Sequence, residues 1–305
     1  TFSVMIKLNG SDGFIIYQKP NTSKRFIGVG NWCVTDKLDY DSPKFIFSTF
    51  DGKTYHLDAN LANSVVKDYC KDVNHIIDTL DELPEGYDLY VDASGFARKF
   101  TTDKTEVIWD HHLVNSAWVC PFELEGEINP YTQTIARECG WQFIIDLQNR
   151  TGSGYVYSDK YISDVQALEQ FKGWTESRKN YNNIVPRLIK WRPNVLKNSW
   201  KDNVVTIGLG QGFVDPLEAN GLYMVVYSIT LLVKCILKGS KPEAYNKAML
   251  KVQKQNSDYL LHHYMLSDRK DTPFWEYYSK FDMDESLWKN YKNCLLYTSD
   301  AADEP

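Results

Sequence analysis

The stretch from Asn203 to Gly221, reading NVVTIGLGQGFVDPLEANG, limits the possible folds of this chain more than any other segment. Val204 to Gly208 are β-branched and apolar enough to form a central strand of a sheet. Gly208, Gly210 and Gly212 then remove side chains at alternate positions, which weakens a strand unless the backbone must approach a neighbour closely. We expect that neighbour to be a ligand.

A helix is predicted to follow the glycines. Pro216 suits the first turn of a helix, Glu218 falls within that turn, and an almost wholly apolar run continues from Leu222 to Leu237. Unpaired amides at a helix start favour anions, so a strand, glycine turn and helix form a general anion and cofactor platform. Two plainer interpretations remain open at this point: a purely structural turn, and a Glu218 that only complements the helix dipole.

The first part of the chain predicts short strands and one long helix. The helix is expected from Asp58 to about Leu83, because apolar residues recur there at helical spacing. The strands are expected at residues 2 to 8, 13 to 18, 44 to 50 and 53 to 57.

The middle of the chain predicts a second, mostly antiparallel sheet. Ser163 and Asp164 are expected to cap a helix that ends near Ser177, and the chain after the glycine stretch is expected to be helical. The strands of this sheet are expected near residues 88 to 92, 105 to 109, 116 to 122, 130 to 137, 141 to 147 and 153 to 158.

Composition and charge exclude several classes of partner. The chain is 43% hydrophobic with a formal net charge of −6, and it has neither a basic field nor an acidic block, so we expect no nucleic-acid partner. The apolar run from Gly221 to Val233 is shorter than the roughly 20 residues that span a bilayer, so we expect a buried core helix and no membrane partner.

Cysteine and histidine patterns indicate a reducing compartment and no metal. Cys33, Cys70, Cys120, Cys139 and Cys235 have the spacing of neither a disulfide framework nor a zinc site, which favours the cytoplasm. The pairs His111-His112 and His262-His263 are sequence neighbours, whose side chains diverge on either a strand or a helix, so neither pair forms a chelate by itself.

Both ends of the chain are unusual. No GxGxxG opens the sequence, and Thr1 begins inside an expected strand, so we expect the N-terminal βαβ unit of a dinucleotide-binding fold to be missing. Residues 294 to 305 begin CLLYTSDAADE, which one frame of a common transposase sequencing adapter encodes; we exclude them from fold reasoning. A natural acidic tail is the alternative.

Several blocks, in order along the chain, resemble the flavin-dependent halogenases of the tryptophan halogenase family. IGLGQGF followed by DPLEANG is similar to the family's IGxAxGF, EPLES or EPLEA, and TG. The other similar blocks are SVMIKL at 3 to 8, LYVDASGF at 89 to 96, GWQFIIDL at 140 to 147, GSGYVYS at 152 to 158 and PRLIKWRP at 186 to 193.

The resemblance implies an α/β, flavin monooxygenase-like FAD-binding fold, truncated at its N-terminal βαβ unit, with a mixed or antiparallel sheet and a C-terminal helical substrate region. Residues 1 to 240 would be the partial FAD-binding and halogenase body, and residues 241 to 293 would begin the helical region. Reduced FAD would come from a separate flavin reductase. With O₂ and chloride or bromide it would give hypohalous acid, which halogenates an electron-rich aromatic small molecule such as an indole.

The resemblance also assigns site residues. Lys7 and Glu218 would be catalytic and would direct the oxidant onto the ring carbon, and the amides of Asn220 and Gly221 would bind halide. Trp141 and Phe143 would shield the substrate from the flavin. The cofactor-binding residues would be Asp92, Gly95, Gly208, Gly210, Gly212, Phe213 and Pro216.

Departures from the family pattern leave alternatives open. The family's WxWxIP becomes Trp141-Gln142-Phe143-Ile144-Ile145-Asp146, which favours a flavin-dependent aromatic monooxygenase that hydroxylates its substrate. Ala219 replaces the family's serine, which removes a hydroxyl near the halide. Retention of Lys7 and Glu218 favours halogenation, because a hydroxylase needs neither. A third possibility is an inactive fragment.

Overall fold

The structure is a computed structural model. It describes the backbone of residues 2–6, 26–29, 32–35 and 53–54, the single positions 65, 67, 68, 70, 73 and 76, and the segments 79–129, 132–178 and 185–281. The expected strands at 13 to 18 and 44 to 50, and residues 294 to 305, lie outside these described residues.

The stretch predicted to be central does form an inner strand. β14 (Val204–Thr206) pairs in parallel with β5 (Leu89–Ala93), and both strands are buried almost throughout. β1 (Phe2–Ile6) pairs antiparallel with the other side of β5, and β13 (Trp200–Lys201) pairs antiparallel with β14. The four strands form one sheet in the order β1-β5-β14-β13.

The second sheet is antiparallel throughout, as expected. It has the strand order β11-β7-β10-β9-β8, and each neighbouring pair is antiparallel. Its strands are β7 (Ser116–Phe122), β8 (Gln133–Arg137), β9 (Gly140–Asp146), β10 (Thr151–Tyr157) and β11 (Arg187–Lys190). The prediction that residues 88 to 92 and 105 to 109 join this sheet is wrong, since both segments pair elsewhere.

Two small sheets complete the described strands. β6 (Glu106–Ile108) and β15 (Gly212–Phe213) flank β12 (Asn194–Leu196) in the first. The second, which the sequence did not predict at residues 26 to 35, consists of β2 (Phe26–Val29), β3 (Trp32–Thr35) and β4 (Lys53–Thr54).

Helices form in the middle and at the C-terminal end of the described chain, where the sequence predicts them. α2 (Asp164–Thr175) begins at a capping box, in which the Ser163 side chain accepts from the Gln166 amide and the Gln166 side chain accepts from the Ser163 amide. After the glycine stretch come α3 (Gly221–Leu237), α4 (Pro242–Met265) and α5 (Pro273–Ser279), which confirms the expected helical end.

The prediction of one long helix from Asp58 to about Leu83 is wrong. Positions 65, 67 and 68 are helical, but the described positions from 70 onward are not. Val65, Val73 and Ile76, which made up part of the expected apolar stripe, are 60%, 38% and 62% exposed. A helix in a protein takes most of its stability from packing an apolar face, and these three described positions of the stripe provide little such packing.

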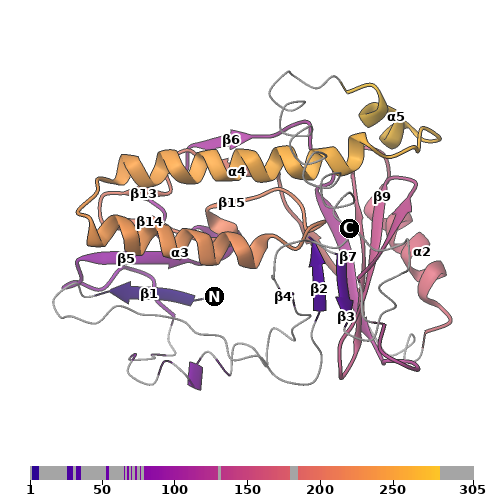
Figure 1. The fold of residues 1–305 in the computed structure, drawn as a ribbon, viewed down its shortest axis with the longest axis horizontal. Coiled ribbons are helices and arrows are strands. Elements are labelled where there is room, and N and C mark those ends of the chain that lie inside the picture. The colour runs from indigo at the N-terminus through magenta and orange to yellow at the C-terminus, as the bar shows by residue number, and fades with distance from the viewer. Residues whose placement is uncertain are drawn as a thin grey trace, which may run out of the picture.

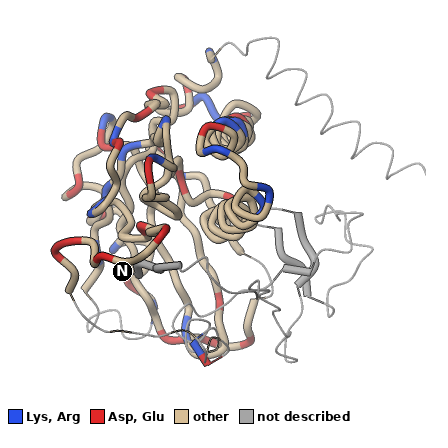
Figure 2. Tube along the Cα trace, turned by 90° about the vertical axis from the view of Figure 1, so that its left-hand side faces the viewer, with Lys and Arg blue, Asp and Glu red and all other residues tan. Residues whose placement is uncertain are grey.

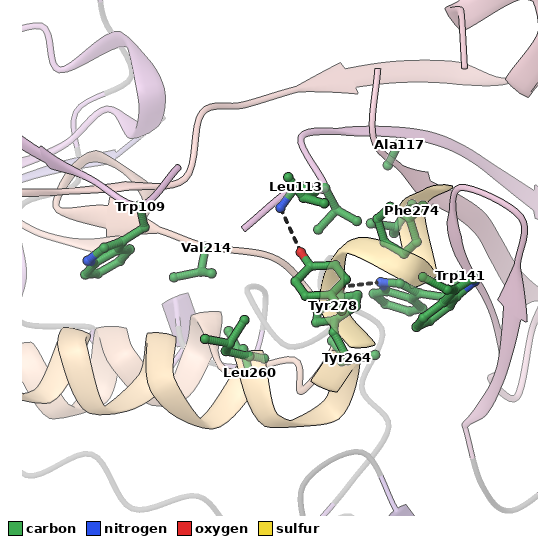
Figure 3. Close-up of a cluster of buried hydrophobic side chains, with 14 of the residues drawn as sticks. Trp109, Leu113, Ala117, Trp141, Val214, Leu260, Tyr264, Phe274 and Tyr278 are labelled. Atoms are coloured by element: carbon green, nitrogen blue, oxygen red, sulfur yellow. Dashed lines mark hydrogen bonds between the residues drawn. The ribbon is translucent and has the colours of Figure 1, made fainter. Parts of the chain in front are cut away.

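The core joins the sheets to the C-terminal helices. α3 and α4 run beside each other, and α4 extends from the four-stranded sheet towards the five-stranded one (Figure 1). One apolar cluster combines Trp109, Trp141 and Val214 from the strand body with Leu260 and Tyr264 of α4 and with aromatic residues of α5 (Figure 3). The predicted boundary at residue 240 therefore lies where helices pack directly on the body; whether it divides domains stays a prediction.

The described surface shows no obvious segregation of charge. Basic and acidic residues are interspersed along the described tube (Figure 2). Among the described helices, none combines the length and the apolar character needed to cross a bilayer.

Gly154 in β10 provides a direct test of how the second sheet packs. A Cβ there would lie 2.6 Å from two ring carbons of Phe143 and 2.9 Å from the Trp118 carbonyl oxygen. We expect Gly154→Ala to destabilise the protein by about 1–3 kcal/mol, because overpacking forces the ring or the strand to move. Gly173→Ala is the matched control, since a Cβ at this exposed position of α2 meets nothing within 4 Å and should stabilise the helix. Equal denaturation midpoints for the two variants would contradict this packing.

Candidate functional site

The loop after β5 is organised by Asp92. Its carboxylate oxygens accept hydrogen bonds from the Ser94 amide at 3.0 Å, the Phe100 amide at 2.9 Å and the Thr101 hydroxyl at 2.8 Å. Burial raises the pKa of Asp92, but these hydrogen bonds outweigh burial and the net pKa is lowered. Asp92 thus shapes a turn in which Gly95 takes a left-handed φ of 69°. Contact of either residue with a cofactor stays a prediction.

The three glycines after β14 meet protein rather than open space. A Cβ on Gly210 would lie 2.9 Å from the Gly95 carbonyl oxygen, and a Cβ on Gly212 would lie 3.0 Å from the Asn194 carbonyl oxygen. Gly208 has a left-handed φ of 65° at the start of the short 3-10 helix η3 (Gly208–Gly210). The close neighbour of Gly210 and of Gly212 on the side of a Cβ is therefore another loop of the chain. Contact of their backbone with a cofactor stays a prediction.

The loops that follow β5 and β14 lie together and expose apolar side chains. η1 (Gly95–Ala97) contacts η3, and Phe96 and Leu209 on these two turns are 44% and 41% exposed. The Phe96 ring packs edge-on against Phe213 at 5.9 Å between centroids. Ligands of α/β folds bind at the carboxyl ends of parallel strands, and this pair of turns occupies that position for the parallel pair β5 and β14.

Glu218 lies in a turn before the helix, which corrects the predicted helix start. α3 begins at Gly221 and has no acidic residue in its first turn, so Glu218 is not the first-turn carboxylate that the sequence predicted. The Asp215 carboxylate accepts from the Leu217 amide at 2.7 Å, and the Ala219 amide donates to the Pro216 carbonyl at 3.0 Å. Both contacts close a turn around Pro216.

Ala219 completes this turn in the left-handed region, with φ 51°. This conformation costs a residue with a side chain about 1–2 kcal/mol relative to its usual regions, so the surrounding contacts must hold it. The strained residue lies directly beside the predicted catalytic carboxylate. Such strain is commonly found at functional sites.

The predicted halide residues lie at the start of α3. Asn220 precedes the helix, but its side chain does not cap it; the amide nitrogen Nδ2 donates instead to Oδ1 of Asn256 on α4, at 2.5 Å. The side chain therefore links the start of α3 to α4. Halide binding by the amides of Asn220 and Gly221 stays a prediction.

The Glu218 side chain faces α4, where sequence reasoning did not place a partner. Its Oε1 lies 2.7 Å from Nε2 of His263, and the two side chains are 2% and 29% exposed. In the sequence, His263 is notable only as half of the neighbouring pair His262-His263. No cluster of three or more His, Cys, Asp or Glu side chains suited to a metal ion occurs among the described residues.

A buried hydrogen-bonded chain connects this segment to the predicted shielding block. The Tyr264 hydroxyl donates to Oδ2 of Asp215 at 3.1 Å, and Trp141 Nε1 donates to the Tyr264 oxygen at 3.0 Å, as Figure 3 shows for the second contact. Burial raises the pKa of Asp215 to about 6, although the Leu217 amide, the Tyr264 hydroxyl and the charge of His263 oppose it.

The shielding residues lie on one face of β9. The Trp141 and Phe143 rings are 6.0 Å apart between centroids, and Trp141 is fully packed in the core between β9 and the C-terminal helices. Asp146, which replaces the family's proline, accepts from the Thr151 hydroxyl at 2.7 Å and from the Asn129 amide at 3.0 Å. This substitution therefore closes the end of a hairpin. Lys7 directly follows β1 and lies outside the described residues.

Comparisons with known proteins agree on one family. The sequence model of the tryptophan halogenase family matches residues 55–295. Tryptophan 6-halogenase SttH of Streptomyces toxytricini is 32% identical over 267 residues, covering 75% of this chain and 50% of that protein. Tryptophan 7-halogenase KtzQ of Kutzneria is 34% identical over 203 residues, covering 62% and 37%. The chain thus spans half or less of the length of these curated relatives.

Solved structures show the same likeness. The crystal structure of SttH matches with a TM-score of 0.71 and 28% identity, over 79% of this chain and 53% of that one. A tryptophan C-6 flavin-dependent halogenase from taromycin biosynthesis matches with a TM-score of 0.68 and 27% identity, over 79% and 54%. The mixed α/β fold with antiparallel sheets is therefore shared with these enzymes over part of their length.

Proposed function

This chain belongs to the tryptophan halogenase family, and we propose that the full-length protein is a flavin-dependent halogenase of electron-rich aromatic molecules. The observation that carries the proposal is the buried Glu218 carboxylate. It lies in the turn before α3, beside Ala219 with its left-handed φ, and His263 is 2.7 Å away. A buried carboxylate held in one orientation suits the removal of a proton from a ring carbon.

The cofactor that the family implies is FAD. The described residues suit a planar aromatic ring system, because Phe96 and Leu209 expose apolar surface on the two turns at the carboxyl ends of β5 and β14. When bound and reduced, FAD supplies hypohalous acid from O₂ and halide. The residues that would line its site are those that the resemblance assigns: Asp92, Gly95, Gly208, Gly210, Gly212, Phe213 and Pro216. A flavin reductase would supply the reduced form.

Within this proposal the two catalytic residues have distinct tasks. Lys7 holds hypohalous acid by a hydrogen bond from its ammonium group or carries the halogen as a haloamine. Glu218 orients that species and accepts the proton that leaves when the ring regains aromaticity. Trp141 and Phe143 keep the substrate away from the cofactor. Trp141 is hydrogen-bonded to Tyr264, which is hydrogen-bonded to Asp215. These bonds support the separation, since they hold the Trp141 ring against the segment that carries Glu218.

The relatives suggest the substrate class. The two curated relatives described above are named for the 6 and 7 positions of tryptophan. We therefore place an indole first among candidate substrates, with phenols and pyrroles next. Hydroxylation is the second candidate, favoured by the change of the second tryptophan of the family's WxWxIP block to Phe143 and of its proline to Asp146.

The test is an assay of the full-length protein with FAD, a flavin reductase, O₂ and bromide or chloride on a panel of indoles, phenols and pyrroles. We expect mass spectra with the isotope pattern of one bound halogen, and loss of that product in Lys7→Ala. Oxygenated products without halogen would favour the hydroxylase instead. Unchanged product formation by Lys7→Ala would remove that lysine from the site.

A further inference from the structure

His263 has a fixed proton at one ring nitrogen. Its Nδ1 lies 3.1 Å from the carbonyl oxygen of Tyr259, one turn earlier on α4, and the Tyr259 ring packs edge-on against the imidazole at 4.9 Å. A carbonyl oxygen can only accept, so Nδ1 must carry hydrogen and donate. The ring is thereby held in one orientation, with Nε2 directed at Glu218.

The contact with Glu218 therefore contains one further proton. At 2.7 Å, Nε2 and Oε1 are within hydrogen-bond distance, and two lone pairs cannot face each other there. Either a protonated imidazole donates to a carboxylate, or a carboxylic acid donates to a neutral imidazole. In the first case the histidine carries a positive charge against a carboxylate that is almost wholly buried.

The surroundings favour the charged pair. Burial lowers the pKa of His263, but the hydrogen bond and charge of Glu218, the Tyr259 carbonyl and the charge of Asp215 raise it, and the net pKa is raised above its ordinary value of 6.5. The described ionisable groups that act on His263 are Glu218 and Asp215, both on the segment before α3. On α4 itself, the Tyr259 carbonyl also acts on it, through a hydrogen bond. Lys7 lies outside the described residues.

We propose that His263 is a positioning residue for Glu218, in which the imidazolium donates to Oε1 and fixes the orientation of the carboxylate that accepts the ring proton. This inference rests on the proposed function. When the new carbon–halogen bond is in place, the ring C–H bond breaks and its electron pair returns to the ring. The proton goes to the Glu218 carboxylate, which passes it to water before the next turnover.

The first test uses two replacements of His263 in the full-length protein. His263→Gln keeps a donor near the position of Nε2 but removes the charge, and His263→Phe removes both. We expect kcat to fall about 10-fold and about 100-fold respectively, with KM for the aromatic substrate unchanged within about twofold, because the lost interaction acts on the proton-transfer step. The matched control is His262→Gln, at the preceding residue of α4, and this variant should retain kcat.

The pH profile separates positioning from a merely structural role. In the unaltered enzyme, kcat falls on the basic side as His263 loses its proton, with a midpoint above 6.5. Asp215, whose pKa is about 6, titrates on the acidic side. His263→Gln should abolish the basic limb that belongs to His263. A His263→Phe variant that keeps both kcat and this limb would overturn the proposal.

A measurement without turnover distinguishes failure of the inference from failure of the proposed function. NMR of the histidine rings, with His263 assigned by its absence from His263→Gln, should give a pKa above 6.5 that drops in Glu218→Gln. A His263 pKa at or below 6.5, or one that is the same in Glu218→Gln as in the unaltered protein, would overturn the charged pair even if halogenation is observed. If no halogenated product forms, the proposed function fails, and the titration still shows whether His263 and Glu218 form a charged pair.

Discussion

Replacing Glu218 with glutamine in the full-length protein lowers kcat for halogenation by about 10²- to 10⁴-fold, the range that general acid–base groups contribute. Glutamine has nearly the same shape and still hydrogen-bonds to Nε2 of His263, but it cannot accept the ring proton. Because the side chain is only 2% exposed, no water can readily take its place. Steady-state kinetics on the best substrate measure the change, and KM should move little because the loss is confined to the transition state.

Glu243→Gln is the control for this substitution. Glu243 is an exposed carboxylate in the first turn of α4, away from the turn that carries Glu218. The same chemical change there should leave kcat within about twofold, as expected for a surface substitution. If Glu218→Gln kept more than half of the original kcat while its thermal midpoint was unchanged, Glu218 could not be the proton acceptor.

Local sequence signals predicted the helices and strands around this site, but they did not predict the geometry of the site. The strand at β14, the capping box at Ser163 and the apolar helix α3 all follow from patterns within a few residues. The helix start was misplaced because Pro216 also suits a turn, and the Asp215 side chain satisfies the Leu217 amide without a helix. A left-handed Ala219 has no sequence signature, since alanine rarely adopts that conformation.

The pairing of Glu218 with His263 could not be predicted, because it is a contact between segments distant in the sequence. The periodicity of apolar residues predicts which face of α4 is buried, but it does not identify the segment that packs against this face. One signal was present: His263 precedes Tyr264, which is fully buried, so the histidine lies near the core edge of an otherwise polar helix. The loops that lie against Gly210 and Gly212 could not be predicted for the same reason, since glycine indicates a close neighbour without identifying it.

The second large effect is expected from replacing Arg98, and it concerns the stability of the protein. Its guanidinium donates from Nε to the Gly210 carbonyl at 2.6 Å, from Nη2 to Oδ1 of Asn194 at 2.6 Å, and from Nη1 to the Glu106 carboxylate. These bonds tie the loop after β5, which carries Phe96, to η3, which carries Leu209, and to the β6–β12 pair. The arginine itself is buried and holds a left-handed φ of 45°.

We expect Arg98→Ala to lower the free energy of unfolding by about 1–3 kcal/mol, because it leaves the buried Gly210 carbonyl and Asn194 side chain, and the partly exposed Glu106 carboxylate, without their donor. Arg98→Lys should recover only part of this loss, since an ammonium group cannot reproduce the planar fork that reaches three acceptors. Lys99→Ala is the control: its ammonium pairs with an exposed Asp81, and surface pairs contribute little. Chemical denaturation of the three variants measures the differences. A loss below about 1 kcal/mol for Arg98→Ala would mean that the two turns are held together by their backbone packing alone, and flavin affinity should then be insensitive to Arg98 as well.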